Sequence, residues 1–202
     1  MRHYPLIALL LLVSLAGVAA AETVVFQPDV ETGRDTFVVA SFPGTAMEGW
    51  GVLWVEAEGG PDETHAHTYI AFDALDEHLG RTVAAAELQL YVKNLEGGGT
   101  FTLGAVDGEW TEKDLCWNNR PGTYERSRQP LAYPGEPDAW HTIDVTDYVQ
   151  AWLDGTIPNH GFCLYDDDDE AAFVSAYAAD KWSEAEYFPK LIVEFTSAAV
   201  GP

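Results

Sequence analysis

The chain has 202 residues, of which 33 are acidic and 10 are basic, so its formal net charge is −23. A surface this negative repels nucleic acid and anionic membranes, which excludes both classes of partner. Three interpretations of the acidity stay open: solubility in a salty or alkaline medium, binding of divalent cations, and attraction of a cationic partner. Solubility is the commonest reason for a net charge far from zero.

The N-terminus has the features of a secretory signal peptide. Arg2 precedes an apolar run over residues 6–18, and three alanines at 19–21 form a small-residue cleavage site. The run is too short to span a bilayer as a helix. We therefore expect a signal peptide over residues 1–21 and a secreted protein, extracellular or at the cell surface, without membrane insertion after cleavage.

The mature chain is predicted to form one domain over residues 22–197, followed by a short tail at 198–202. Leu88, Leu90 and Val92 alternate with polar residues, a pattern typical of an antiparallel sheet with one wet face. Short segments of this kind, separated by turn residues, favour an all-β antiparallel sandwich or jelly roll. The expected strands are 23–27, 36–40, 51–56, 67–72, 87–92, 100–106, 141–145, 161–165, 172–177 and 190–195.

Two other elements are expected along the chain. Residues 110–121 place Trp110 and Trp117 on either side of a polar turn, which predicts a short strand and a loop at a sheet edge. Near residue 146 the apolar spacing changes to that of a helix, with Thr146 as its cap and Gly155 at its end. We expect this one short helix to cap an end of the sandwich.

The acidic run that follows suggests a calcium site. Asp166, Asp167 and Asp168 offer carboxylate oxygens, the ligands that Ca²⁺ prefers. A solvated loop is the alternative, because consecutive aspartates cannot all converge on one ion. His65 and His67 form a weaker zinc hypothesis, set against ordinary surface histidines. No cofactor is otherwise required.

Several of these segments together resemble the DNRLRE-domain family, extracellular β-sandwich modules related to a family of carbohydrate-binding modules. The resemblance rests on residues 110–121, 143–152, 159–164 and 189–195, and on the strands near 37, 70 and 90. It implies a sandwich fold and a carbohydrate partner, and it implies no chemistry. Ser175-Ala176-Tyr177 departs from the family pattern, in which Arg-Glu follows Ala-Ser.

The two cysteines, Cys116 and Cys163, predict a disulfide in an exported protein. If both lay on strands, alternation would turn each sulfur to the outer face, away from its large apolar neighbours. Two free, half-buried thiols are the alternative.

Candidate ligand-binding residues are aromatic side chains in polar loops or at strand ends, because aromatic faces cover the C–H surfaces of sugars. Trp110, Trp117 and Trp152 are expected to pack within the fold instead. A basic cluster of Arg120, Arg126 and Arg128 offers a site for a uronate or sulfate, or balances nearby acids. The aromatic candidates are Trp182, flanked by Lys181, together with Tyr187, Trp50, Trp54, Tyr124 and Tyr133.

The function that fits these features is a non-catalytic carbohydrate-binding module that recognises extracellular polysaccharide or a cell-surface glycan. The alternative is a structural subunit of a filament, surface layer or biofilm matrix, self-assembled through sheet edges. A polysaccharide-processing enzyme ranks third, since no catalytic motif occurs and paired carboxylates arise by chance among 33 acids.

Overall fold

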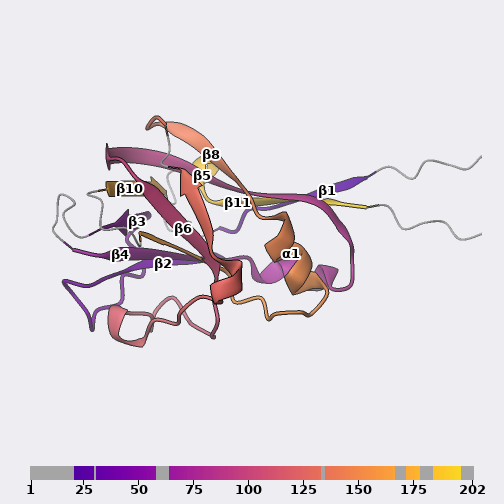
Figure 1. Cartoon of the computed structure of the whole chain (residues 1–202), viewed down its shortest axis with the longest axis horizontal. Helices are drawn as coiled ribbons and strands as arrows, with labels where there is room; N and C mark the ends of the chain where they lie inside the picture. The colour runs from indigo at the N-terminus through magenta and orange to yellow at the C-terminus, as the bar shows by residue number, and fades with distance from the viewer. Residues whose placement is uncertain are drawn as a thin grey trace, which may run out of the picture.

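The computed structural model describes residues 21–29, 31–57, 64–132, 135–166, 172–177 and 184–196. Within these ranges the chain forms two layers of antiparallel strands with one α-helix at an end of the stack (Figure 1). The expected signal peptide and C-terminal tail, and the candidates Lys181, Trp182, Tyr133, Asp167 and Asp168, lie outside the described residues.

The first layer is built around β5, a strand of 15 residues. On one side β5 pairs with β8, and on the other its first part pairs with β11 and its last part with β10. Strand β1 extends the layer from β11, and β3 extends it from β10. The bounds are β1 Glu22–Phe26, β3 Val52–Glu56, β5 Val83–Gly97, β8 Ala139–Asp144, β10 Ala172–Tyr177 and β11 Lys190–Phe195.

The second layer has the order β2-β4-β9-β6-β7. It joins the first layer where Glu56 of β3 pairs with Ala66 of β4. All these pairings are antiparallel, so the predicted all-β sandwich is confirmed. The bounds are β2 Arg34–Val39, β4 Ala66–Ala71, β6 Thr100–Ala105, β7 Gln129–Ala132 and β9 Phe162–Asp166.

The space between the layers is filled by the side chains that the alternation predicted. Leu88, Leu90 and Val92 are buried, whereas Glu87 is exposed. Leu191, Val193 and Phe195 of β11 are fully buried in the same core. Burying a large aliphatic or aromatic side chain contributes about 1.5–3 kcal/mol. The core is therefore the main source of stability.

Helix α1 (Thr146–Leu153) covers one end of this core, as predicted (Figure 1). Its side chains Trp152 and Leu153 are each 2% exposed. Thr146 does not cap the helix, contrary to the prediction, because its hydroxyl accepts the Ala86 N–H and donates to Asp144. Gly155 follows with a φ of 76°, which ends the helix as expected. In the described part, no helix is long and apolar enough to cross a membrane.

Two segments differ from the prediction. Residues 110–121 contain no strand, and their regular structure is the 3₁₀ turn η2 (Trp117–Asn119). Strand β7 was not predicted. It contains Pro130, which is tolerated because, among the described strands, β7 pairs with β6 alone. Three further 3₁₀ turns are η1 (Asp73–His78), η3 (Glu125–Ser127) and η4 (Ala185–Tyr187).

Gly161 is expected to be far less replaceable than Gly155, although both have a positive φ. A Cβ on Gly155 would meet nothing within 4 Å, so Gly155→Ala should cost only the backbone penalty of about 1 kcal/mol. A Cβ on Gly161 would collide with the Ile70 carbonyl oxygen and lie 2.8 Å from Ala71 Cβ. Gly161→Ala should therefore cost about 3 kcal/mol or more. Urea unfolding of both variants measures this, and equal losses would contradict the packing described.

Candidate functional site

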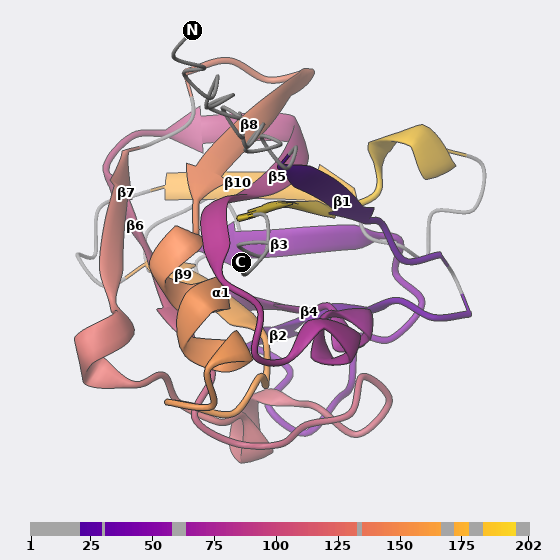
Figure 2. The ribbon, with the colours of Figure 1, turned by 90° about the vertical axis from the view of Figure 1, so that its right-hand side faces the viewer.

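A loop over residues 107–128 covers the outer face of the second layer (Figure 2). Trp110 and Leu115 of this loop are buried against Tyr69 of β4 and Cys163 of β9. The Trp110 indole lies edge-on to Tyr69, with ring centroids 5.7 Å apart. Strands β4 and β9 are consequently buried on both faces, so the loop is an integral part of the fold. We call it the covering loop.

Hydrogen bonds hold the covering loop at several points. Trp110 Nε1 donates to the His160 carbonyl oxygen at 2.8 Å, and the Tyr69 hydroxyl donates to the Pro121 carbonyl oxygen at 2.8 Å. Farther along, the Ser127 hydroxyl donates to the Tyr124 carbonyl oxygen and accepts the Ala105 N–H. These hydrogen bonds fix the covering loop, and so the side chains that it carries, in the absence of a ligand.

The predicted disulfide between Cys116 and Cys163 is not seen in the structure, in which neither cysteine forms a disulfide. The prediction placed Cys116 on a strand, whereas it precedes η2, where its N–H donates to Asn119 Oδ1 at 2.8 Å. Cys163 does lie on a strand, facing away from the main core as expected, but it is buried beside Tyr69 under the covering loop.

Two arginines of the covering loop line a cavity of about 320 Å³, which we call the arginine pocket. The Arg120 guanidinium stacks on the Trp117 ring at 3.6 Å, and its Nη1 donates to the Trp117 carbonyl oxygen. Arg128 Nε donates to the Thr123 hydroxyl at 3.2 Å. Both guanidiniums keep further N–H groups for a ligand. The other walls include His67, Tyr69, Pro121, Gly122, Cys163 and Tyr165.

Among the residues that the structure describes, neither arginine of the pocket has a carboxylate partner. Within the described residues, the ion pairs join Arg34 to Asp73, Arg81 to Glu22 and Lys93 to Asp138, and none includes Arg120 or Arg128. In a chain with 33 acidic residues, unpaired arginines are unexpected. The pocket therefore carries two guanidiniums on a negative molecule, and the Asp107 carboxylate lies next to its Gly122 wall.

Two titratable wall residues of the pocket, His67 and Tyr69, are neutral at pH 7. Burial, followed by the charge of Arg120 and then by His65, lowers the pKa of His67 from 6.5 to about 3. The imidazole packs between Trp117 and Tyr165, with ring centroids at 4.8 and 5.2 Å. Burial, followed by the influence of Cys163, raises the pKa of Tyr69, so that its hydroxyl stays protonated.

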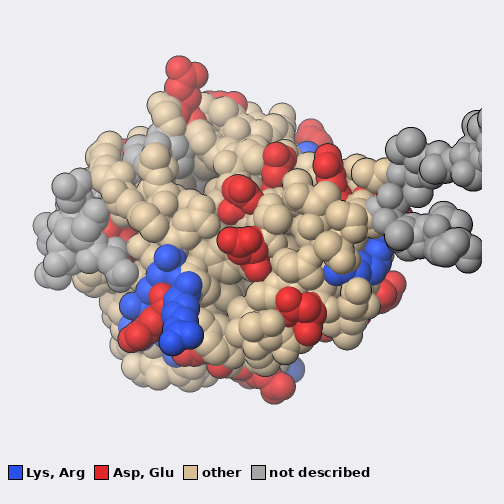
Figure 3. All heavy atoms as spheres, turned by 45° about the vertical axis from the view of Figure 1, so that its right-hand side comes forward, with Lys and Arg blue, Asp and Glu red and all other residues tan. Residues whose placement is uncertain are grey.

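A second cavity, of about 860 Å³, adjoins the pocket through Arg128, which lines both. Tyr124 and Arg126 line this cavity, together with the carboxylates of Glu125, Asp144 and Asp147, and Arg126 forms no ion pair within the described part. On the face drawn in Figure 3, basic side chains gather in two places and acidic ones are more widely spread. We call Tyr124, Arg120, Arg126 and Arg128 the arginine surface. The structure thus brings together four of the residues predicted from the sequence.

The remaining candidates lie elsewhere. Trp50 is 61% exposed and touches Phe37 edge-on, and Trp54 lies half-buried against the same ring. Tyr187 lies at the first layer, with its ring centroid 4.1 Å from that of Tyr91. These three residues are not brought to the arginine surface, and their role in binding stays a prediction.

The described residues provide no set of ligands for the predicted calcium site or for the predicted zinc site. Within the described ranges, no group of three or more His, Cys, Asp or Glu side chains is placed to hold an ion. Asp166 ends β9 as a buried residue, whereas its neighbours 167 and 168 lie outside the described ranges. The calcium site stays a prediction.

Sequence reasoning missed Thr123 and Tyr165, which line the arginine pocket. The signal for Tyr165 was present, because Phe162 and Leu164 point to the main core, so Cys163 and Tyr165 must point to the covering loop. Thr123 had no such signal, since its position follows from a bridge to Val106 and from close contact with Gly104.

His67 is expected to make the fold less stable in acid. The unfolded chain binds this proton below about pH 6.5, whereas the folded chain binds it only near pH 3, so stability falls as the pH drops from 6.5 toward 3. His67→Gln should reduce this loss, and His141→Gln serves as the control. Urea midpoints at pH 7 and pH 4.5 measure the effect; an unchanged pH dependence in His67→Gln would refute it.

Comparison with protein families matches residues 27–194 to one family model, described as carbohydrate-binding module family 96. The match spans all the strands from β2 to β10, the covering loop and most of β11. Among curated proteins, none matches the chain. The predicted relation to carbohydrate-binding modules is thereby confirmed, whereas the DNRLRE label stays a prediction.

Proposed function

The chain belongs to carbohydrate-binding module family 96, and from that premise we propose that it binds acidic polysaccharide through the arginine surface. The observation that carries the proposal is the pair Arg120 and Arg128, which line one cavity without a carboxylate partner in the described part. A guanidinium offers a planar fork of donors that matches the two oxygens of a carboxylate or sulfate.

Preorganisation supports this role. Arg120 is held by its stack on Trp117 and by its bond to the Trp117 carbonyl oxygen, so little side-chain entropy remains to be lost on binding. The neutral imidazole of His67 adds no competing charge at neutral pH. The pocket can thus receive one charged group without rearrangement.

The rest of the arginine surface suits the neighbouring sugar units. The adjoining cavity has more than twice the volume of the pocket, and its wall carries Tyr124 and two arginines beside the carboxylates of Glu125, Asp144 and Asp147. A tyrosine ring can cover the C–H face of a sugar while its hydroxyl stays in water. The arginines also offset the repulsion between an acidic chain and an acidic polymer.

We further propose that the protein acts outside the cell and without catalysis. Support comes from the basic and apolar N-terminal segment and from membership of a binding-module family. The alternative of a filament or matrix subunit remains a prediction that no observation favours over binding.

Removing either arginine should weaken binding to acidic polysaccharide about 10-fold or more, because a hydrogen bond between charged groups contributes about 1.5–3 kcal/mol. Affinity electrophoresis with a polyuronate, a sulfated galactan and a neutral glucan tests this on Arg120→Gln and Arg128→Gln. Arg120→Lys, which keeps the charge and loses the fork, should bind more weakly than the native chain.

Lys113→Gln is the matched control, since Lys113 is exposed on the same loop and carries the same charge. It should bind almost as well as the native chain, and binding should weaken as salt rises. Equal affinity of the native chain for neutral and acidic polymers, or full binding by both arginine variants, would refute the proposal.

A further inference from the structure

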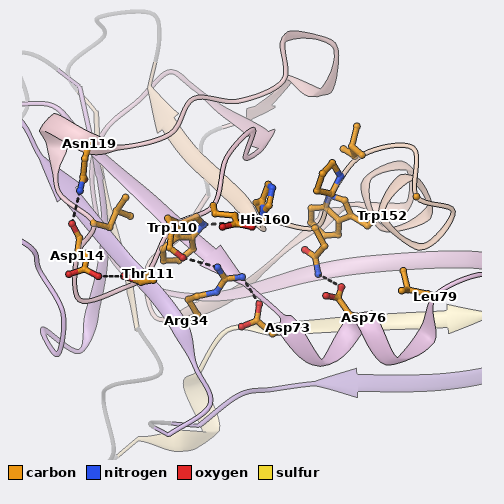
Figure 4. Close-up of a pocket in the computed structure, with 16 residues that line it drawn as sticks. Arg34, Asp73, Asp76, Leu79, Trp110, Thr111, Asp114, Asn119, Trp152 and His160 are labelled. Carbon is orange, nitrogen blue, oxygen red and sulfur yellow. Dashed lines mark hydrogen bonds and ion pairs between the residues drawn. The ribbon is translucent and has the colours of Figure 1, made fainter.

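A third hollow lies beside Trp110, bounded by the start of β2, by η1, by the covering loop and by the segment after α1 (Figure 4). Its volume is about 1050 Å³. Trp110 and Trp152 form part of its wall, and Leu79 stands at it with 62% of its surface exposed. We call it the acidic groove, because its lining includes four carboxylates, those of Asp73, Asp76, Glu109 and Asp114, beside Arg34 and His160.

The walls of the groove are held in place by polar contacts. Arg34 pairs with Asp73, donates to the Trp110 carbonyl oxygen at 3.0 Å and lies 4.8 Å from the Trp110 ring centroid. Asn159 Nδ2 donates to Asp76 Oδ1 at 3.1 Å (Figure 4). These contacts hold segments that are far apart in the sequence around the acidic groove.

Three buried polar atoms in these walls have no hydrogen-bond partner among the protein groups described. They are Arg34 Nε and Trp152 Nε1, which are donors, and Asn159 Oδ1, which is an acceptor. Trp152 itself is only 2% exposed. A buried polar group without a partner is costly, so such a group in a native fold points to a partner of another kind.

From these observations we propose that the acidic groove is a second carbohydrate site, which takes an uncharged sugar residue. Sugar hydroxyls both donate and accept, so they match the two donors and the acceptor among the lining residues. The indoles offer apolar surface for C–H groups. Four carboxylates against one guanidinium, itself paired with Asp73, repel an acidic sugar. The two sites therefore differ in the chemistry that they accept.

This inference stands apart from the arginine surface and is tested with uncharged probes. Gluco-, manno-, galacto- and xylo-oligosaccharides of six units are titrated into the native chain by calorimetry. At least one should bind, and Asn159→Ala should weaken it about 10-fold. Because Asn159 also supports the wall, Leu79→Ser provides a second variant at an exposed position, with an expected loss of several-fold; urea midpoints confirm that both variants fold.

Arg128→Gln is the control that separates the two sites, since it should leave uncharged probes unaffected while weakening acidic ones. Failure of every uncharged probe to bind at millimolar concentration would overturn the second site and leave the arginine surface standing. Unchanged affinity of Asn159→Ala and Leu79→Ser for the uncharged probe would also overturn the second site. Displacement of the bound probe by an oligouronate would do the same. If the native chain bound an uncharged probe but no acidic polymer, the arginine surface would be refuted and the second site supported.

Discussion

The packing of Trp110 against Tyr69 is the contact on which the functional surface depends. It anchors the covering loop to β4, while the Trp110 N–H and the Tyr69 hydroxyl tie the same loop to His160 and Pro121. Tyr69 lines the arginine pocket and Trp110 lines the acidic groove, so this aromatic pair forms the wall between the two hollows. Buried aromatic contacts of this kind fix geometry because interiors are close-packed.

The arginine pocket and the acidic groove differ in the charge of the residues that line them. On one side Arg120 and Arg128 have no carboxylate partner in the described part of the chain, and His67 is held neutral beside them. On the other side Arg34 is neutralised by Asp73 among further carboxylates. The net charge of −23 therefore does not predict the local charge at a site the size of one sugar unit. Local pairing decides which ligand each site can accept.

The sequence predicted what local periodicity determines. Leu88, Leu90 and Val92 alternate, so they revealed the core face of β5, and the Arg120 cluster was visible because its members are close in sequence. Cys116 was misplaced, because apolar neighbours imitate a strand where the chain forms a 3₁₀ turn. The acidic groove could not be predicted, since Arg34, Trp110 and Asn159 meet only after the whole sandwich has formed.

The central claim is that the arginines of the covering loop contact the ligand directly. Arginine Nε–H signals in two-dimensional ¹⁵N NMR spectra, recorded at constant ionic strength while an oligouronate is added, test it most directly. The account predicts saturable shifts for Arg120 and Arg128 and none for Arg81, which is paired with Glu22. Unmoved signals from both loop arginines while the oligouronate binds would contradict it.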